Sequence, residues 1–261
     1  MEKMIIKVCG MRDGENIRQV TALGVDWIGL IFYDRSPRNV TMIPTHAGII
    51  PDRGSDIGNF KAKRVGVFVD EMPQNIITRV VNFKLDMVQF HGHETPTMIR
   101  NLRRTLDPDI RPGIKFIKAI SVESRDDIAA YKDYTGCVDY FLFDTKCPTA
   151  GGSGSHFDWS LLDAYDGQTP FLLSGGIGPD DADRVRSFFS AAFSVGSGSA
   201  AAPPSAALSA PASPAPAAFS VGSGSAAAKC LGIDLNSRFE TEPGIKDPAA
   251  LARFLNALHS H

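Results

Sequence analysis

Two side chains that can exchange protons stand at the ends of short apolar runs in this sequence. Cys9 ends the run at residues 5–9, and Asp144 ends the run at 140–144. If both runs are parallel strands of one barrel, their carboxyl ends share one mouth, where such folds carry their chemistry. The pattern therefore predicts a thiol and a carboxylate that act as an acid/base pair. The alternative for Cys9 is a small buried hydrophobic side chain, the commoner fate of a free cysteine.

A thiol that acts as a base needs a positive neighbour. The pKa of a free cysteine is about 8.5, so only a small fraction is thiolate at neutral pH. Lys7 precedes Cys9 by two residues, and side chains two apart in a strand point to the same side. We therefore expect the Lys7 ammonium group to lie on the side of the strand that carries the thiol.

Two turns predict a phosphate site. Gly175 and Gly176 follow an apolar run and precede a helical segment, so their N–H groups can approach an anion at a helix N-terminus. The turn after the last apolar run contains Asp234, Asn236 and Ser237, whose amides and hydroxyl offer further donors. Loops after strands seven and eight form the usual phosphate cradle of a barrel. A Gly-Gly pair alone is equally typical of a tight structural turn.

Three other features are candidates for ligand contact. Arg38, in Ser36-Pro37-Arg38, can hold a carboxylate in a bidentate fork, and a solvated loop arginine is the alternative. His91 ends an apolar run and either lines the pocket or packs as a hydrogen-bonded histidine. The glycine cluster at 150–155 is either a surface loop or a lid that closes over ligand.

Eight short apolar runs alternate with amphipathic stretches along the chain. Most are continuous in Val, Ile, Leu and Phe, which is typical of parallel strands covered on both faces. The runs lie at 5–9, 27–33, 64–69, 87–91, 116–120, 140–144, 171–174 and 230–235. Helices are expected at 13–23, 73–83, 96–106, 180–188 and 248–259, with weaker ones at 124–131 and 158–162.

This order predicts an α/β fold, a single (β/α)₈ TIM-barrel domain over residues 1–261. An open doubly wound sheet is the alternative, but eight units exceed what such sheets usually use. In addition, no Gly-x-Gly-x-x-Gly follows the first run. Prolines and glycines interrupt the connection at 42–62, so a short or poorly formed helix is expected there.

Residues 190–228 break the pattern between the seventh helix and the eighth strand. Almost all of them are Ala, Ser, Pro or Gly, none is charged, and the same twelve residues occur at 191–202 and 217–228. A stretch of this composition cannot form a packed core of its own. The duplicated ends favour an engineered insertion, and a natural low-complexity loop is the alternative.

The net charge, the cysteine spacing and the length of the apolar runs argue against several functional classes. A net charge of −2 gives no electrostatic reason to expect nucleic acid or an anionic membrane as partner. The four cysteines have no metal-binding spacing, so no metal is expected, and reduced thiols indicate a cytoplasmic protein. We find neither a signal-peptide pattern nor an apolar run long enough to span a membrane.

The motifs in their order resemble phosphoribosylanthranilate isomerase, a (β/α)₈ enzyme of tryptophan biosynthesis. The resemblance covers nearly the whole chain apart from 190–228, and the order and spacing of the motifs make it specific. The matching stretches are Lys7-Val8-Cys9-Gly10, Ser36-Pro37-Arg38, Gly66-Val67-Phe68-Val69, Gln89-Phe90-His91-Gly92, Phe143-Asp144-Thr145, Gly152-Ser153-Gly154 with Phe157-Asp158-Trp159, Leu173-Ser174-Gly175-Gly176, and Gly232-Ile233-Asp234-Leu235-Asn236-Ser237 leading to Pro243-Gly244-Ile245-Lys246-Asp247.

The resemblance implies an Amadori rearrangement of N-(5′-phosphoribosyl)anthranilate without metal or cofactor, and a monomer is expected. Asp144 would be the general acid that opens the furanose ring, and Cys9 the general base that removes the C2 proton. Arg38 would hold the anthranilate carboxylate, while Gly175-Gly176 and Asn236-Ser237 would hold the phosphate. The substrate, a phosphosugar joined to anthranilate, is the partner implied.

One position departs from the family pattern, and two other functions compete. Arg238 stands where the family usually has a small residue, often glycine, so it either reaches the phosphate or points to solvent.

A related enzyme, the histidine-pathway Amadori isomerase, is a competing function. That enzyme uses an aspartate where Cys9 stands, so the thiol argues against it. The duplicated segments raise a different possibility, a barrel scaffold that carries an inserted peptide, with catalysis incidental.

Overall fold

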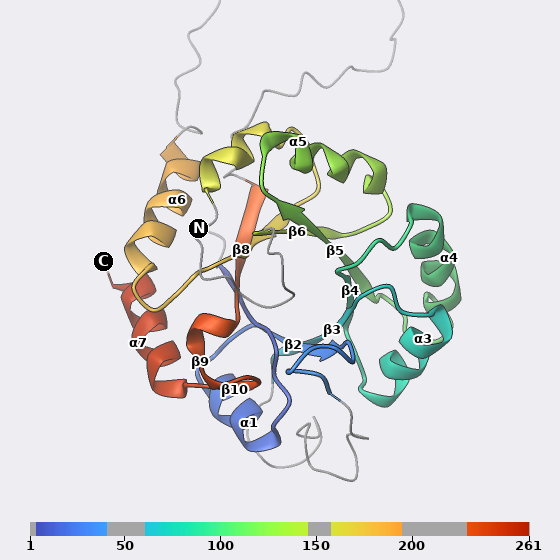
Figure 1. The fold of residues 1–261 in the computed structure, drawn as a ribbon, viewed down its shortest axis with the longest axis horizontal. Helices are drawn as coiled ribbons and strands as arrows, with labels where there is room; N and C mark the ends of the chain where they lie inside the picture. Colours follow the sequence, from blue (N-terminus) through green and yellow to red (C-terminus); the bar gives the residue numbers. More distant parts are fainter. Residues whose placement is uncertain (1–3, 41–60, 146–157, 195–228, 261) are drawn as a thin grey trace, which may run out of the picture.

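The computed structural model describes residues 4–40, 61–145, 158–194 and 229–260. Its eight parallel strands close into one barrel in chain order, with β1 paired to β8 as well as to β2 (Figure 1). The fold is therefore the predicted (β/α)₈ barrel rather than an open sheet. The strands are β1 Ile5–Val8, β2 Trp27–Phe32, β3 Lys63–Phe68, β4 Met87–Phe90, β5 Lys115–Val122, β6 Tyr140–Thr145, β7 Phe171–Leu173 and β8 Cys230–Leu235.

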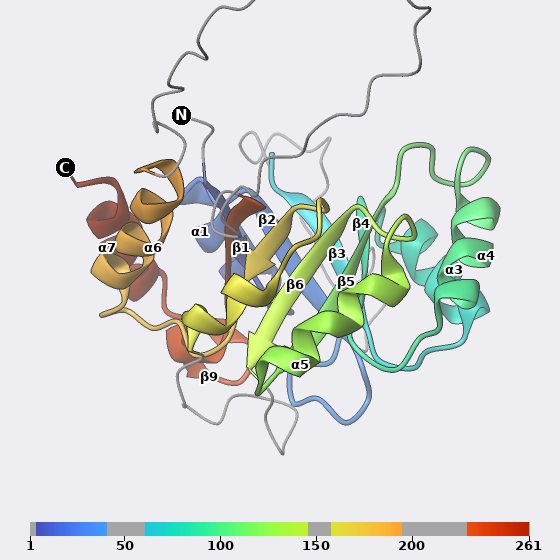
Figure 2. The same ribbon diagram turned by 90° about the horizontal axis from the view of Figure 1, so that it is seen from above.

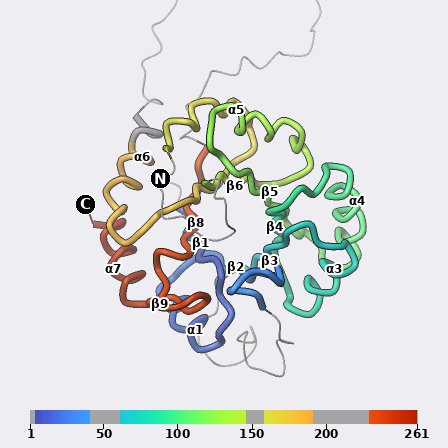
Figure 3. Tube along the Cα trace, viewed as in Figure 1, coloured from blue at the N-terminus to red at the C-terminus, as the bar shows by residue number. Residues whose placement is uncertain are grey.

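Helices surround the barrel on its outside, as the chain trace shows (Figure 3). In the perpendicular view, α3 and α4 lie on one side of the barrel and α6 and α7 on the opposite side (Figure 2). The helices are α1 Gly14–Ala22, α3 Pro73–Asn82, α4 Pro96–Leu106, α5 Arg125–Ile128, α6 Ala182–Ser194 and α7 Pro248–His259.

Local capping chemistry fixes where several of these helices begin. The side chain of Asp13 accepts a hydrogen bond from the Asn16 N–H before α1, and the Thr95 hydroxyl accepts one from the Met98 N–H before α4. Asp247 caps α7 in the same way. Such caps satisfy N–H groups that have no partner inside the helix, so the chain enters each helix at a defined residue.

The elements predicted within the described residues are present, with small differences at their ends. The helices at 96–106 and 248–259 and the strand at 230–235 have the predicted bounds. Helix α6 begins two residues later than predicted and extends to Ser194. The weak segments form the short α5 and two 3₁₀ helices, η1 Ala129–Tyr134 and η2 Trp159–Ala164.

The sequence patterns did not predict one pair of strands, and several predicted segments lie outside the residues that the structure describes. After β8 the chain forms a 3₁₀ turn, η5 Ser237–Phe239, and then an antiparallel pair, β9 Glu240–Glu242 and β10 Ile245–Lys246. Two- and three-residue strands are too short to show a hydrophobic period. The expected lid at 150–155, nearly all of the connection at 42–62 and most of the segment at 190–228 lie outside the described residues.

The barrel strands carry both apolar and polar buried side chains. One cluster of buried side chains fills one part of the interior, and it consists of Trp27, Val65, Met87, Ile117, Ala119, Leu142 and Leu172. Lys7, Gln89 and Asp234 are also buried, and Lys7 and Asp234 are register partners in the neighbouring strands β1 and β8. Buried charged groups need partners, so this polar part of the interior indicates where the chemistry lies.

Candidate active site

Cys9 follows β1 directly and is almost fully buried at 4% exposure. Its backbone N–H donates to the Leu235 carbonyl across 2.8 Å, which ties it to the end of β8. Its thiol packs against β2, because a Cβ placed on Gly29 would lie 2.6 Å from the Cys9 Sγ. A glycine in β2 therefore makes the space that the thiol occupies.

The neighbour predicted for the thiol is present. The Lys7 ammonium, fully buried, donates to Asp234 Oδ1 at 2.9 Å and interacts electrostatically with Cys9. Burial alone works to lower the pKa of Lys7, but Asp234 and Cys9 together raise it, so the lysine carries a proton. Burial raises the pKa of the Cys9 thiol, and the positive charges of Lys7 and Lys246 oppose that rise.

Asp144 lies near the carboxyl end of β6 with its side chain 26% exposed. Its Oδ1 accepts from the Thr145 N–H at 2.9 Å, and its Oδ2 lies 3.6 Å from His91 Nε2. Burial raises the pKa of this carboxyl, and hydrogen bonds from Thr145 and Ser174 together with the charge of Lys7 offset only part of the rise. Lys7 thus acts electrostatically on both Asp144 and Cys9, which face one end of the barrel.

His91 follows β4 and contributes a neutral ring to this site. Burial, followed by the charges of Lys118 and Lys7, lowers the pKa of His91 from 6.5 to about 4. Its Nδ1 lies 3.4 Å from Gln89 Nε2. The Gln89 Oε1 is buried and has no hydrogen-bond partner among the described residues. The sequence pattern does not mark Gln89 as a site residue, since a single polar residue within an apolar run resembles an interruption of that run.

Arg38 takes part in an ion cluster that sequence reasoning missed. Its Nε and Nη2 form a side-on fork with Glu240, at distances from 2.6 to 3.0 Å. Glu240 Oε1 also accepts from Lys246 Nζ at 2.5 Å, and Lys246 donates to Asn236 Oδ1 at 2.9 Å. A Cβ on Gly10 would lie 2.7 Å from both Arg38 Cδ and Asn236 Oδ1, so the cluster packs against the residue after Cys9.

The two turns that suggested a phosphate site take different forms. Gly175 and Gly176 have φ angles of +88° and +70°, which favour glycine, and a Cβ on Gly175 would collide with the Thr145 hydroxyl. Ser237 begins η5. The exposed Arg238 reaches toward the other turn, because its Nε would lie 3.2 Å from a Cβ on Gly178.

Asp234 occupies a different place from the one its position in the last turn suggested. Its carboxylate points into the barrel and binds the Lys7 ammonium. A carboxylate repels an anion, so the Asp234 side chain supports Lys7 rather than a phosphate group. Burial raises the pKa of Asp234, and Lys7 opposes that rise.

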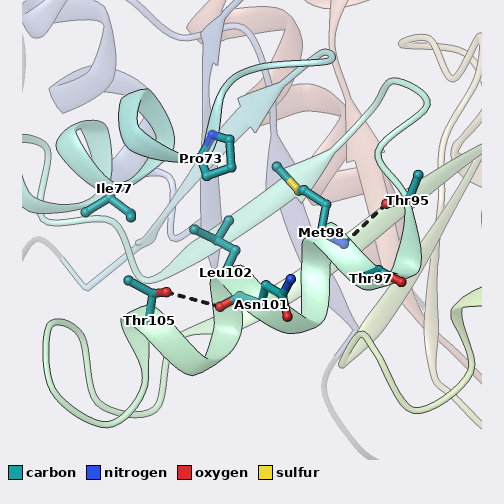
Figure 4. Close-up of a pocket in the computed structure, with 8 residues that line it drawn as sticks. All are labelled: Pro73, Ile77, Thr95, Thr97, Met98, Asn101, Leu102 and Thr105. Atoms are coloured by element: carbon teal, nitrogen blue, oxygen red, sulfur yellow. Dashed lines mark hydrogen bonds between the residues drawn. The ribbon is translucent and has the colours of Figure 1, made fainter.

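A groove on the outer surface is separate from these residues. It lies between α3 and α4 and shares no residue with the barrel mouth (Figure 4). Pro73, Ile77, Thr95, Thr97, Met98, Asn101, Leu102 and Thr105 line it. Within the described ranges, no helix has the length and apolarity needed to cross a membrane, and no His, Cys, Asp and Glu cluster has metal-site geometry.

Comparison with known proteins connects this geometry to a family. Residues 6–193 match the family model described as N-(5′-phosphoribosyl)anthranilate (PRA) isomerase. The PRA isomerase of Parabacteroides distasonis is 39% identical over 98% of this chain and 93% of its own length. That of Phocaeicola vulgatus is 37% identical over 98% of each chain. This chain belongs to the PRA isomerase family.

A solved structure agrees with this assignment. The crystal structure of the Thermotoga maritima PRA isomerase is 27% identical, covers 98% of both chains and superposes with a TM-score of 0.68. The chain is therefore an isomerase that converts N-(5′-phosphoribosyl)anthranilate to 1-(2-carboxyphenylamino)-1-deoxyribulose 5-phosphate in tryptophan biosynthesis. The family resemblance inferred from the motifs is thereby confirmed.

Proposed function

We propose that Asp144 is the general acid and Cys9 the general base of this isomerisation. The Asp144 carboxyl gives its proton to the furanose ring oxygen as the C1–O bond breaks, which leaves a protonated Schiff base. The Cys9 thiolate then removes the proton from C2, and the electron pair of the C–H bond forms an enolamine. Tautomerisation of the enolamine, in which the 2-hydroxyl group loses a proton and C1 gains one, gives the ketone, so product and substrate are isomers.

The environment of Asp144 is the observation that carries this proposal. Burial raises the pKa of this carboxyl, so a larger share of it holds a proton to donate than in water. The neighbouring His91 is neutral at pH 7 and does not compete as a cationic acid. The acid role thus rests on a side chain whose charged form the protein disfavours.

Cys9 needs an environment that tolerates a thiolate, and the charges around it supply one. The positive charges of Lys7, Lys246 and Arg38 interact electrostatically with the thiol, and the negative charge of Asp234 opposes them. Burial still raises the pKa of the free thiol, so we propose that the thiol releases its proton to water when the iminium cation of the opened substrate lies beside it, which leaves the thiolate.

The remaining binding roles follow from charge and backbone geometry. Arg38 is proposed to bind the anthranilate carboxylate, and His91 to line the space between carboxylate and sugar. The Gly175 and Gly176 amides, with the turn at Asn236 and Ser237, are proposed to bind the phosphate, supported by the left-handed backbone of both glycines. The Asp234 carboxylate is proposed to act only by holding the Lys7 ammonium group in place.

The physiological setting is also a proposal. A cytoplasmic monomer that acts on this small substrate, without nucleic acid or membrane as partner, is consistent with the net charge of −2. The proton transfers above call for no metal or cofactor. Sedimentation equilibrium of the full chain at micromolar concentration tests the monomer, and a mass twice that of the chain would contradict it.

Two substitutions test the acid and base roles directly. Asp144→Asn removes the acidic proton and Cys9→Ser weakens the base, and each should reduce kcat at least about a hundredfold. KM should change little, because neither group is proposed to hold the carboxylate or the phosphate. The decrease of anthranilate fluorescence during turnover measures both constants. A kcat within threefold of the parent value for either folded variant contradicts its role.

A further inference from the structure

The buried carboxylate of Glu240 has three donors and no assigned role. It receives the fork of Arg38, the ammonium of Lys246 and, at 3.2 Å, the backbone N–H of Gly244. Its side chain is only 5% exposed. A carboxylate so buried is costly unless it is fully paired, so its presence beside the site calls for a physical reason.

The strand pair after β8 fixes this carboxylate in space. Glu240 and Lys246 are register partners in β9 and β10, which Pro243 and Gly244 connect in a tight turn. Gly244 has a φ of +90°, a conformation that glycine adopts without strain. Asn16 in α1 binds both the N–H and the carbonyl of Lys246 at 2.8 Å, which anchors β10 to the barrel.

The ion pair with Glu240 leaves one edge of the Arg38 guanidinium group for a ligand. A guanidinium presents two edges with paired N–H groups, one formed by Nε and Nη2 and the other by Nη1 and Nη2. Glu240 occupies the first edge. Among the described residues the structure gives no hydrogen-bond partner for Nη1 of Arg38, so the second edge keeps its donors for an incoming carboxylate.

We propose that Glu240 is a positioning residue that holds Arg38 side-on, so that its end-on edge meets the carboxylate of the substrate. The proposal rests on the carboxylate-binding role proposed for Arg38. Lys246 serves as the second anchor of Glu240, because it sits opposite Glu240 in the strand pair and packs against Gly10 and Asn236. Although burial works to raise the pKa of Glu240, the bonds from Arg38 and Lys246 lower it, so the anchor stays ionised at neutral pH.

The test compares two stable ligands that differ only in the carboxylate. The first is the reduced product, 1-(2-carboxyphenylamino)-1-deoxyribitol 5-phosphate, and the second is its phenylamino counterpart without the carboxylate. Calorimetry measures both affinities for the parent chain and for Glu240→Gln. A misoriented Arg38 should weaken binding of the first ligand about tenfold or more, and binding of the second less than twofold.

Matched variants separate this proposal from the role of Arg38. Glu242→Gln is the same substitution on the same strand at an exposed position, and it should change neither affinity. Arg38→Met should remove most of the preference for the carboxylate ligand; if it does not, the role of Arg38 itself fails. If Arg38→Met removes the preference and Glu240→Gln retains it, the positioning role of Glu240 alone is wrong.

Two further outcomes also overturn the proposal. Equal weakening of both ligands would show that Glu240 only supports the fold, and tighter binding of the carboxylate ligand would show that Glu240 competes with it for Arg38. Glu240→Asp keeps the charge but shortens the side chain by one methylene, so it should show the same selective loss. This second variant decides the question if Glu240→Gln does not fold.

Discussion

The space that Gly29 leaves for the Cys9 thiol permits a sharp test of the proposed base. In Gly29→Ala the new methyl group would lie 2.6 Å from Cys9 Sγ, 3.0 Å from Cys9 Cα and 3.2 Å from Cys9 Cβ. Ordinary contacts between carbon atoms lie at about 3.5–4.0 Å, so the thiol must move by roughly 1 Å. The backbone has little freedom to help, because the Gly29 carbonyl accepts from the Met11 N–H at 2.9 Å within the barrel.

The expected consequence is a large loss of kcat with little change in KM. A misplacement of about 1 Å at a reacting group can reduce the rate about a hundredfold. The substitution does not touch the groups proposed to bind the carboxylate and the phosphate, so KM should stay close to the parent value. Overpacking should also lower the free energy of unfolding by about 1–3 kcal/mol, a moderate loss that leaves the protein folded at 25 °C.

The assay combines turnover, measured by anthranilate fluorescence, with thermal unfolding of the same preparation. Gly24→Ala is the matched control, since Gly24 has a φ of +82° and no heavy atom within 4 Å of the added Cβ. It should lose about 1 kcal/mol of stability from backbone strain and keep its full kcat. A folded Gly29→Ala variant with kcat within threefold of the parent would refute the placement of the thiol as the base.

Three further predictions concern charge and protonation. Burial raises the pKa of Asp144 in the folded protein. The contribution of Asp144 to the free energy of unfolding is therefore fully present below the ordinary aspartate pKa of about 3.9, and it is lost as the pH rises through the raised value. Asp144→Asn should therefore unfold at a higher temperature than the parent at pH 7, with a gap that closes toward pH 4; a lower Tm at pH 7 contradicts this. The lowered pKa of His91 gives stability that is present above 6.5 and lost as pH falls toward about 4, so His91→Gln should flatten the fall of Tm across that window, and an unchanged slope would count against it. If Arg238 reaches the phosphate, Arg238→Gly should raise KM up to about fivefold at low salt and leave kcat unchanged, and equal KM values at low salt would show that it does not.

Local sequence signals were enough to predict most of the barrel. Apolar runs and amphipathic segments are properties of each strand and helix alone, so they can be recognised in the sequence without knowledge of which strands pair. Asp13, Thr95 and Asp247 mark helix starts by chemistry within three residues. For the same reason, Cys9 and Asp144 stand out at the ends of their runs.

The ion pairs of the site are not visible in the sequence. Lys7 binds Asp234 across 227 positions of the chain, and Arg38 binds Glu240 across 202. Both pairs exist only because β8 returns to close the barrel against β1 and the chain then folds back as β9 and β10. The sequence pattern therefore places Asp234 in a phosphate turn and gives no signal for Glu240, which is one acidic residue near another.

The sequence by itself determined the strands, the helices and the proton-exchanging groups at the mouth, because neighbouring residues specify them. Only the tertiary structure decided which charges surround the Cys9 thiol and which edge of Arg38 faces a ligand. The physical reason is that a buried charge is tolerable only beside its partner, and barrel closure brings these partners together from opposite ends of the chain.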